Sequence, residues 1–314
     1  MISNLANYND WKRGTLDRVT NKHNAEMLKL FATHLRSLKP VMAQALDAGM
    51  TTFHFDEVVI AAQLEKILNR HLRDTVYVAV SDGMREVSPD KKLSTWINWP
   101  VWYPVEKTFV ELAERKQRDS IFKFTVDKVS KLNRKNIADI IQIEKQRYLK
   151  NIKSIFGQLA EEYYGGRDES TTAEVVKDVI ARIFDKTKSQ TERIFRTETT
   201  RYFNDARIAY FNENTDVDFV QLMAITDGRI SNICESRDKY VIPLAQAGNK
   251  KFKPPFHPNC RTIQSPLVTY LKSNADKVRN NLGSEFGLVH SDTSDKDFQG
   301  QRAPPAVSLP VGWA

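Results

Sequence analysis

The stretch IADIIQIEKQRYLKNIKSIFGQL, residues 137 to 159, decides the fold class of this chain. Its apolar residues recur at spacings of three and four, which predicts an amphipathic helix with one buried face. The surrounding residues 106–164 continue the pattern, and we expect one or two long helices there. The apolar stripe consists of Ile137, Ile140, Ile141, Tyr148, Ile152, Ile155, Phe156 and Leu159.

Residues 15–85 are also predicted to be helical, because apolar residues recur there with the same period. Pro40 is expected to interrupt the first helix and Gly49 to end it. Phe55 or Asp56 is expected to start a second helix, with Gly83 as its stop.

Residues 165–170, GGRDES, predict a break. Thr171 and Glu174 then have the spacing of a capping box at a helix start. This pattern predicts one helix through Phe184 and another from about Ser189 to Phe211.

The pattern changes beyond residue 214. VDFVQLMAIT, residues 217–226, alternates with period two and predicts a strand, for which RTIQSPL, residues 261–267, is a plausible partner. The predicted fold is therefore mainly α. A helical region at 1–188 precedes a small α+β domain at 189–275, and the polar residues 276–314 are expected to form an extended or disordered tail.

The net charge of +8 is concentrated in residues 115–153, which contain twelve lysines and arginines and four acidic residues. Such a basic helix face attracts a polyanion such as DNA. An acidic neighbouring protein, or a merely solvated face, is an alternative explanation. The candidate DNA-contacting residues are Lys123, Lys128, Lys131, Arg134, Lys135, Lys145, Arg147, Lys150 and Lys153.

Three tryptophans, Trp96, Trp99 and Trp102, lie in the proline-containing segment WINWPVWYPVEK, residues 96–107. This segment is interpreted as a loop that covers the helical core, or as a contact with another subunit.

No stretch approaches the roughly 20 consecutive apolar residues that a membrane-spanning helix needs, so no membrane partner is expected. With only two cysteines, the chain has no disulfide framework and is expected to be made in a reducing cytosol.

Polar residues that form a candidate site gather in the second half of the chain. One predicted helix places several of them on one face, and two arginines there can hold carboxylates or carbonyls by forked hydrogen bonds. The candidates are Arg196, Glu198, Asn204 and Arg207 on this helix, Asp227, Arg229, Cys234 and Asp238 in the next loop, and His257, Cys260 and Arg261 in the segment PPFHPNCR.

Cys234, His257 and Cys260 have three interpretations. They can pack together as small buried groups, they can bind zinc with Asp227, Asp238 or water as a fourth ligand, or the two cysteines can form a disulfide. A Cys/His pair can also serve catalysis, but we find no HExxH, P-loop or GxSxG motif and therefore expect no enzymatic activity and no cofactor, with zinc as the alternative.

In order and spacing, these motifs resemble those of the minor head, or head-morphogenesis, proteins of tailed phages related to the F protein of phage Mu. The resemblance covers about residues 190–265, and two positions where family members often carry cysteine hold Ser231 and Thr262. The matching pieces are Arg196-Thr197-Glu198, Asn204 with Ala206-Arg207, Asp227-x-Arg229 with Cys234 and Asp238, and Pro254-Pro255-x-His257-Pro258-x-Cys260-Arg261.

The resemblance implies a minor capsid protein that acts in head assembly, in the host cytoplasm, and then lies inside the virion. The implied partners are the portal protein, the major capsid or scaffolding protein, and packaged double-stranded DNA bound without sequence specificity. Two other classes remain open. One is a DNA-binding protein that is not part of the virion, and the other is a metal-assisted hydrolase or nuclease that uses Asp227, His257 and Cys260.

Overall fold

The computed structural model describes residues 5–55, 59–87, 109–166, 170–213, 217–225 and 228–268. Within these ranges the chain is mainly helical with a small sheet, so the predicted fold class is confirmed. The elements are α1 (Leu5–Asp47), α2 (Val59–Val87), α3 (Phe109–Tyr164), α4 (Thr172–Phe211), β1 (Val217–Met223), α5 (Asn232–Glu235), β2 (Val241–Pro243), α6 (Leu244–Ala247) and β3 (Ile263–Val268).

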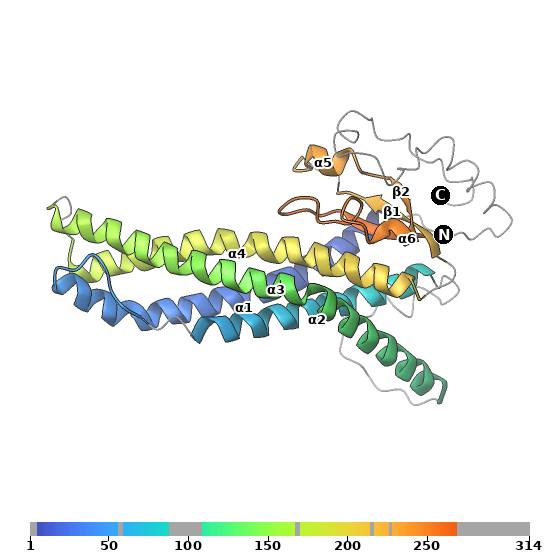
Figure 1. Cartoon of the computed structure of the whole chain (residues 1–314), viewed down its shortest axis with the longest axis horizontal. Coiled ribbons are helices and arrows are strands. Elements are labelled where there is room, and N and C mark those ends of the chain that lie inside the picture. The colour runs from blue at the N-terminus through green and yellow to red at the C-terminus, as the bar shows by residue number, and fades with distance from the viewer. Residues whose placement is uncertain are drawn as a thin grey trace. The chain divides into compact units, whose positions relative to one another are not determined.

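The chain divides into two compact units that do not follow chain order. Unit 1 comprises residues 1–17, 72–131 and 196–314, and unit 2 comprises residues 18–71 and 132–195. In unit 2, segments of the four long helices run side by side (Figure 1). Their facing apolar side chains form the core of unit 2, which includes the fully buried Leu35, Leu64, Ile152 and Val179.

Unit 1 contains the sheet, whose strand order among the described residues is β2-β1-β3 with both pairings antiparallel. Val220 of β1 lies opposite Ile242 of β2 on one side and Pro266 of β3 on the other. The predicted strand at 217–226 and its partner are thus confirmed, whereas β2, α5 and α6 were not predicted.

Two predicted helix stops are wrong. Pro40 lies inside α1, where the burial of its neighbours Leu38 and Met42 offsets the roughly 3 kcal/mol that an interior proline costs. Gly83 lies inside α2, and a Cβ atom there would come within 2.8 Å of Tyr210 Cδ1. Gly83 is therefore explained by close packing against α4.

The predicted division near residues 185–188 is also wrong, because α4 is continuous. Buried residues continue with helical spacing through this stretch, and the Thr187 hydroxyl donates to the Ile183 carbonyl at 2.7 Å. The capping box is confirmed at the start of α4. The Thr171 N–H donates to Glu174 Oε2 at 2.8 Å, and the Glu174 N–H donates to Thr171 Oγ1 at 3.4 Å.

The aromatic segment with Trp96, Trp99 and Trp102 and the predicted tail at 276–314 lie outside the described residues. Of the described helices, none combines the length and apolar character that crossing a membrane requires.

Candidate functional site

The centre of the predicted motif is a buried asparagine that joins α4 to β3. Asn204 is fully buried, and its Nδ2 donates to the carbonyls of Thr200 at 2.7 Å and Thr262 at 3.2 Å. Its Oδ1 accepts the backbone N–H of Gln264 at 2.7 Å. The amide side chain therefore satisfies one backbone N–H of β3 and the carbonyl just before that strand, and it ties both to α4.

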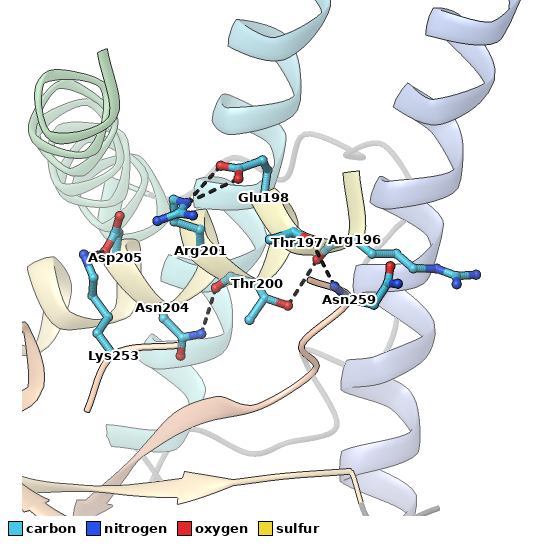
Figure 2. A network of polar contacts seen from close by, with 9 residues as sticks. All are labelled: Arg196, Thr197, Glu198, Thr200, Arg201, Asn204, Asp205, Lys253 and Asn259. Atoms are coloured by element: carbon cyan, nitrogen blue, oxygen red, sulfur yellow. Dashed lines mark hydrogen bonds and ion pairs between the residues drawn. The ribbon is translucent and has the colours of Figure 1, made fainter. Parts of the chain in front are cut away.

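Two threonines of α4 hold the segment that precedes β3. Thr197 Oγ1 accepts the backbone N–H of Asn259 at 3.0 Å, and the Thr200 hydroxyl donates to the Cys260 carbonyl. Figure 2 shows Asn259 beside the helical turn that carries Thr197 and Thr200. Thr197 belongs to the predicted motif piece Arg196-Thr197-Glu198, but neither threonine was named among the candidate site residues.

Two ion pairs lie on the same part of α4 (Figure 2). The carboxylate of Glu198, which is buried, accepts from Arg201 Nε at 3.1 and 3.3 Å. Lys253 Nζ donates to Asp205 Oδ1 at 2.7 Å. This ion pair holds the residue that precedes the segment PPFHPNCR against the helix.

Arg207 is a predicted site residue that binds two carboxylates, as expected for an arginine on this face of the helix. Its guanidinium is fully buried and donates to the carboxylates of Asp82 and Glu86 on α2. The rings of Phe203 and Phe211 lie 5.2 and 5.1 Å from its central carbon. Asp82 and Glu86 were missed, because α2 contains other acidic residues, Glu65 and Asp74 among them, and its sequence does not mark which of them face Arg207.

The segment PPFHPNCR brings its histidine and cysteine to the loop after β1. Cys234 Sγ lies 3.6 Å from Cys260 Sγ and 2.9 Å from His257 Nε2. Ser231 Oγ lies 2.7 Å from the same Nε2. Both cysteines are buried, and all three ligand-type atoms lie within 4.8 Å of one another.

The electrostatics of the two thiols differ. A hydrogen bond from Cys260 lowers the pKa of Cys234 to about 5, against the effect of burial and with smaller help from Ser231, Thr262 and His257. The same hydrogen bond, together with burial, raises the pKa of Cys260 well above its ordinary value. The pair therefore favours one thiolate that accepts from one thiol.

The remaining predicted residues do not join this cluster. Asp238 Oδ1 accepts the backbone N–H of Ala224 at 2.8 Å, and burial raises the pKa of Asp238. Arg196 and Arg229 are exposed, and Arg261 is half-buried. Asp227 lies outside the described residues.

The predicted DNA-contacting residues all lie on α3. Lys128 lies 3.6 Å from Glu213 and over the ring of Phe124, while Arg147 pairs with Glu144. Lys145 and Arg147 are half-buried. The exposed members are Lys123, Lys128, Lys131, Arg134, Lys135, Lys150 and Lys153.

Residues 153–265 match the family model of Phage Mu protein F like proteins. The matched segment runs from the end of the basic stretch on α3 through α4 to β3, and it contains every predicted motif piece. No curated protein and no solved structure matches the chain. The resemblance inferred from the motifs is thus confirmed over this segment, and the match supports a phage Mu F-like head-morphogenesis family.

Proposed function

We propose that this chain is a non-enzymatic structural component of the phage head, associated with the portal and facing the packaged genome. The family match supports a role in head morphogenesis. Most of the polar residues of the motif hold backbone segments or one another, as Asn204 and Thr197 do. This arrangement suits a rigid fold that serves as an assembly part.

The observation that carries the genome contact is the exposed basic surface of α3. In unit 2, Lys150 and Lys153 lie one helical turn apart and line a shallow open depression of about 560 Å³. Gln146 and Ser154 complete its polar lining. Two ammonium groups with neighbouring hydrogen-bond donors suit phosphate oxygens and read no base sequence.

A protein contact, which we assign to the portal or to the major capsid or scaffolding protein, is supported by exposed apolar residues on the same helix. Leu132 is 61% exposed and Ile143 is 50% exposed. The two residues are three helical turns apart and therefore lie on nearly one face. Large apolar side chains at such exposure are typical of a surface that meets another protein.

The proposed location is tested by quantitative mass spectrometry of nuclease-treated virions and proheads, which counts this chain against the portal and major capsid proteins. We expect a few to a few tens of copies in each particle. Absence from both particles would overturn the head role and favour a DNA-binding protein that is not part of the virion.

The DNA contact is tested with the double variant Lys150→Glu/Lys153→Glu. We expect weaker binding to double-stranded DNA of random sequence, and a salt dependence whose logarithmic slope is smaller by about 2, because two phosphate contacts are lost. The matched control is Lys186→Glu/Lys188→Glu, which makes the same charge change at exposed positions of α4. If both double variants weakened DNA binding equally, the affinity would depend on the total charge of the protein and not on Lys150 and Lys153.

A further inference from the structure

We propose that Cys234, His257 and Cys260 bind one Zn²⁺ ion through two thiolates and one imidazole, with the fourth position left to solvent beside Ser231. The site goes beyond the head role and does not depend on it.

The separations of the ligand atoms support this proposal. A tetrahedral zinc ion with Zn–S bonds of about 2.3 Å places two sulfurs roughly 3.8 Å apart, and here the two Sγ atoms are 3.6 Å apart. The same geometry places an imidazole nitrogen roughly 3.6 Å from a sulfur. His257 Nε2 is 2.9 Å from Cys234 Sγ, and all three ligand atoms lie within 4.8 Å of one another. Metal entry therefore requires Nε2 to move about 0.7 Å away from Cys234 Sγ and to lie at a similar distance from Cys260 Sγ.

The orientation of the histidine also suits a metal. His257 Nδ1 lies 2.7 Å from the Pro258 carbonyl, which can only accept, so Nδ1 carries the proton. Nε2, which lies beside Cys234 Sγ and Ser231 Oγ, is then the nitrogen that a neutral imidazole offers to a metal ion. A backbone carbonyl bound to the far nitrogen is the usual means by which proteins orient a zinc-binding imidazole.

The ligands are held in place by α4. His257 and Cys260 belong to one tight turn, in which the Cys260 N–H donates to the His257 carbonyl at 3.2 Å. Thr197 and Thr200 fix the same turn through Asn259 and the Cys260 carbonyl. Cys234 lies in α5, where Ser231 Oγ accepts its backbone N–H at 3.3 Å. Little conformational freedom is therefore left to be lost when an ion binds.

The charge of such a centre is balanced. Two thiolates and a neutral imidazole around Zn²⁺ carry no net charge, which suits a place where both cysteines are buried. A bound ion would tie the loop after β1 to the segment that precedes β3, so binding would stabilise the small sheet unit.

The test begins with reduced full-length protein loaded with Zn²⁺ and dialysed, whose metal content is measured by plasma mass spectrometry. We expect one zinc per chain in the wild type and less than about a tenth of that in Cys234→Ser, Cys260→Ser and His257→Gln. His54→Gln, at an exposed histidine of unit 2, is the matched control and should retain the ion. A strong chelator should lower the melting temperature of the wild type and of this control.

A gain-of-binding variant keeps the proposal testable if the loss variants fold poorly. Ser231→Cys places a third sulfur beside Nε2, and we expect it to lower the Zn²⁺ dissociation constant by about tenfold or more. Bound Co²⁺ should show a stronger thiolate charge-transfer band than in the wild type. A wild-type protein that holds no zinc would overturn the proposal. Equal retention of zinc by all the cysteine and histidine variants would also overturn it, because it would mark adventitious binding elsewhere.

Discussion

Arg207 and Asp82 lie 125 positions apart in the chain and form an ion pair in which both side chains are almost completely buried. The second nitrogen of the guanidinium reaches Glu86, so one arginine compensates two carboxylates. Removing one partner of such a pair leaves an uncompensated charge in the protein interior, which is far more costly than the pair itself is favourable.

We therefore predict that Arg207→Met lowers the free energy of unfolding by about 3–5 kcal/mol. The triple variant Arg207→Met/Asp82→Leu/Glu86→Leu should recover much of this loss, because it removes the buried positive charge together with both of its carboxylate partners. Urea denaturation measures both, with Arg196→Met at an exposed position of the same helix as the control. A loss below about 1 kcal/mol for Arg207→Met would show that water reaches the carboxylates.

Asn204 provides a second prediction. Asn204→Leu should destabilise the protein by about 1–3 kcal/mol, because the Gln264 N–H loses its acceptor inside the core. Hydrogen exchange at that amide should accelerate at the same time. The control Gln221→Leu removes a side-chain bond to the Lys239 carbonyl near the surface and should change stability much less. Unchanged exchange at Gln264 would contradict the role given to Asn204.

Gly83 provides a third prediction. Alanine is the better helix former by about 1 kcal/mol, yet Gly83→Ala should destabilise by about 1–3 kcal/mol, because its Cβ meets the Tyr210 ring at 2.8 Å. Gly14→Ala is the matched control, since a Cβ there meets nothing within 4 Å, and it should stabilise α1 slightly. Thermal melting measures both. Equal stabilisation by both variants would mean that Tyr210 moves aside freely.

The pH dependence of Cys234 provides a fourth prediction, for the reduced and metal-free protein. Its pKa of about 5 in the folded state is below the ordinary value of 9.0, so the unfolded state binds more protons between these values. The stability contributed by Cys234 is therefore fully present above about pH 9 and is lost as the pH falls through about 5.

Thiolate absorbance during a pH titration measures this directly. We expect a step with its midpoint near pH 5 in the wild type and none in Cys234→Ser, where only Cys260 remains. The difference in unfolding free energy between the two proteins should shrink as the pH is lowered through the same range. A thiolate step near the ordinary thiol pKa would contradict the predicted hydrogen bond between the two sulfurs.

The sequence predicted those features that depend on local spacing. The apolar stripe through Ile152, the capping box at Thr171 and the strand that starts at Val217 are patterns within one element, and each is confirmed. The failures at Pro40 and Gly83 have a different cause. A residue that ends isolated helices can lie inside a helix when packing against another element decides the outcome, as Tyr210 does at Gly83.

In the candidate site, too, the residues close in sequence were predicted, whereas the partners from distant elements were not. The motif pieces placed His257, Cys260 and Cys234 in one region, because two of them are three residues apart and the third follows a strand. The carboxylates that face Arg207 could not be assigned, since their helix precedes it by more than a hundred residues. The contact between Ser231 Oγ and His257 Nε2 was likewise missed, because it depends on the orientation of the His257 ring.

The two outer strands of the sheet each contain a proline, Pro243 in β2 and Pro266 in β3. A proline has no N–H to offer a further strand, and β2 is only three residues long. The sheet is thus poorly suited to growth by addition of a strand from a second copy. Copies of the chain are in this way protected from edge-to-edge aggregation through the sheet.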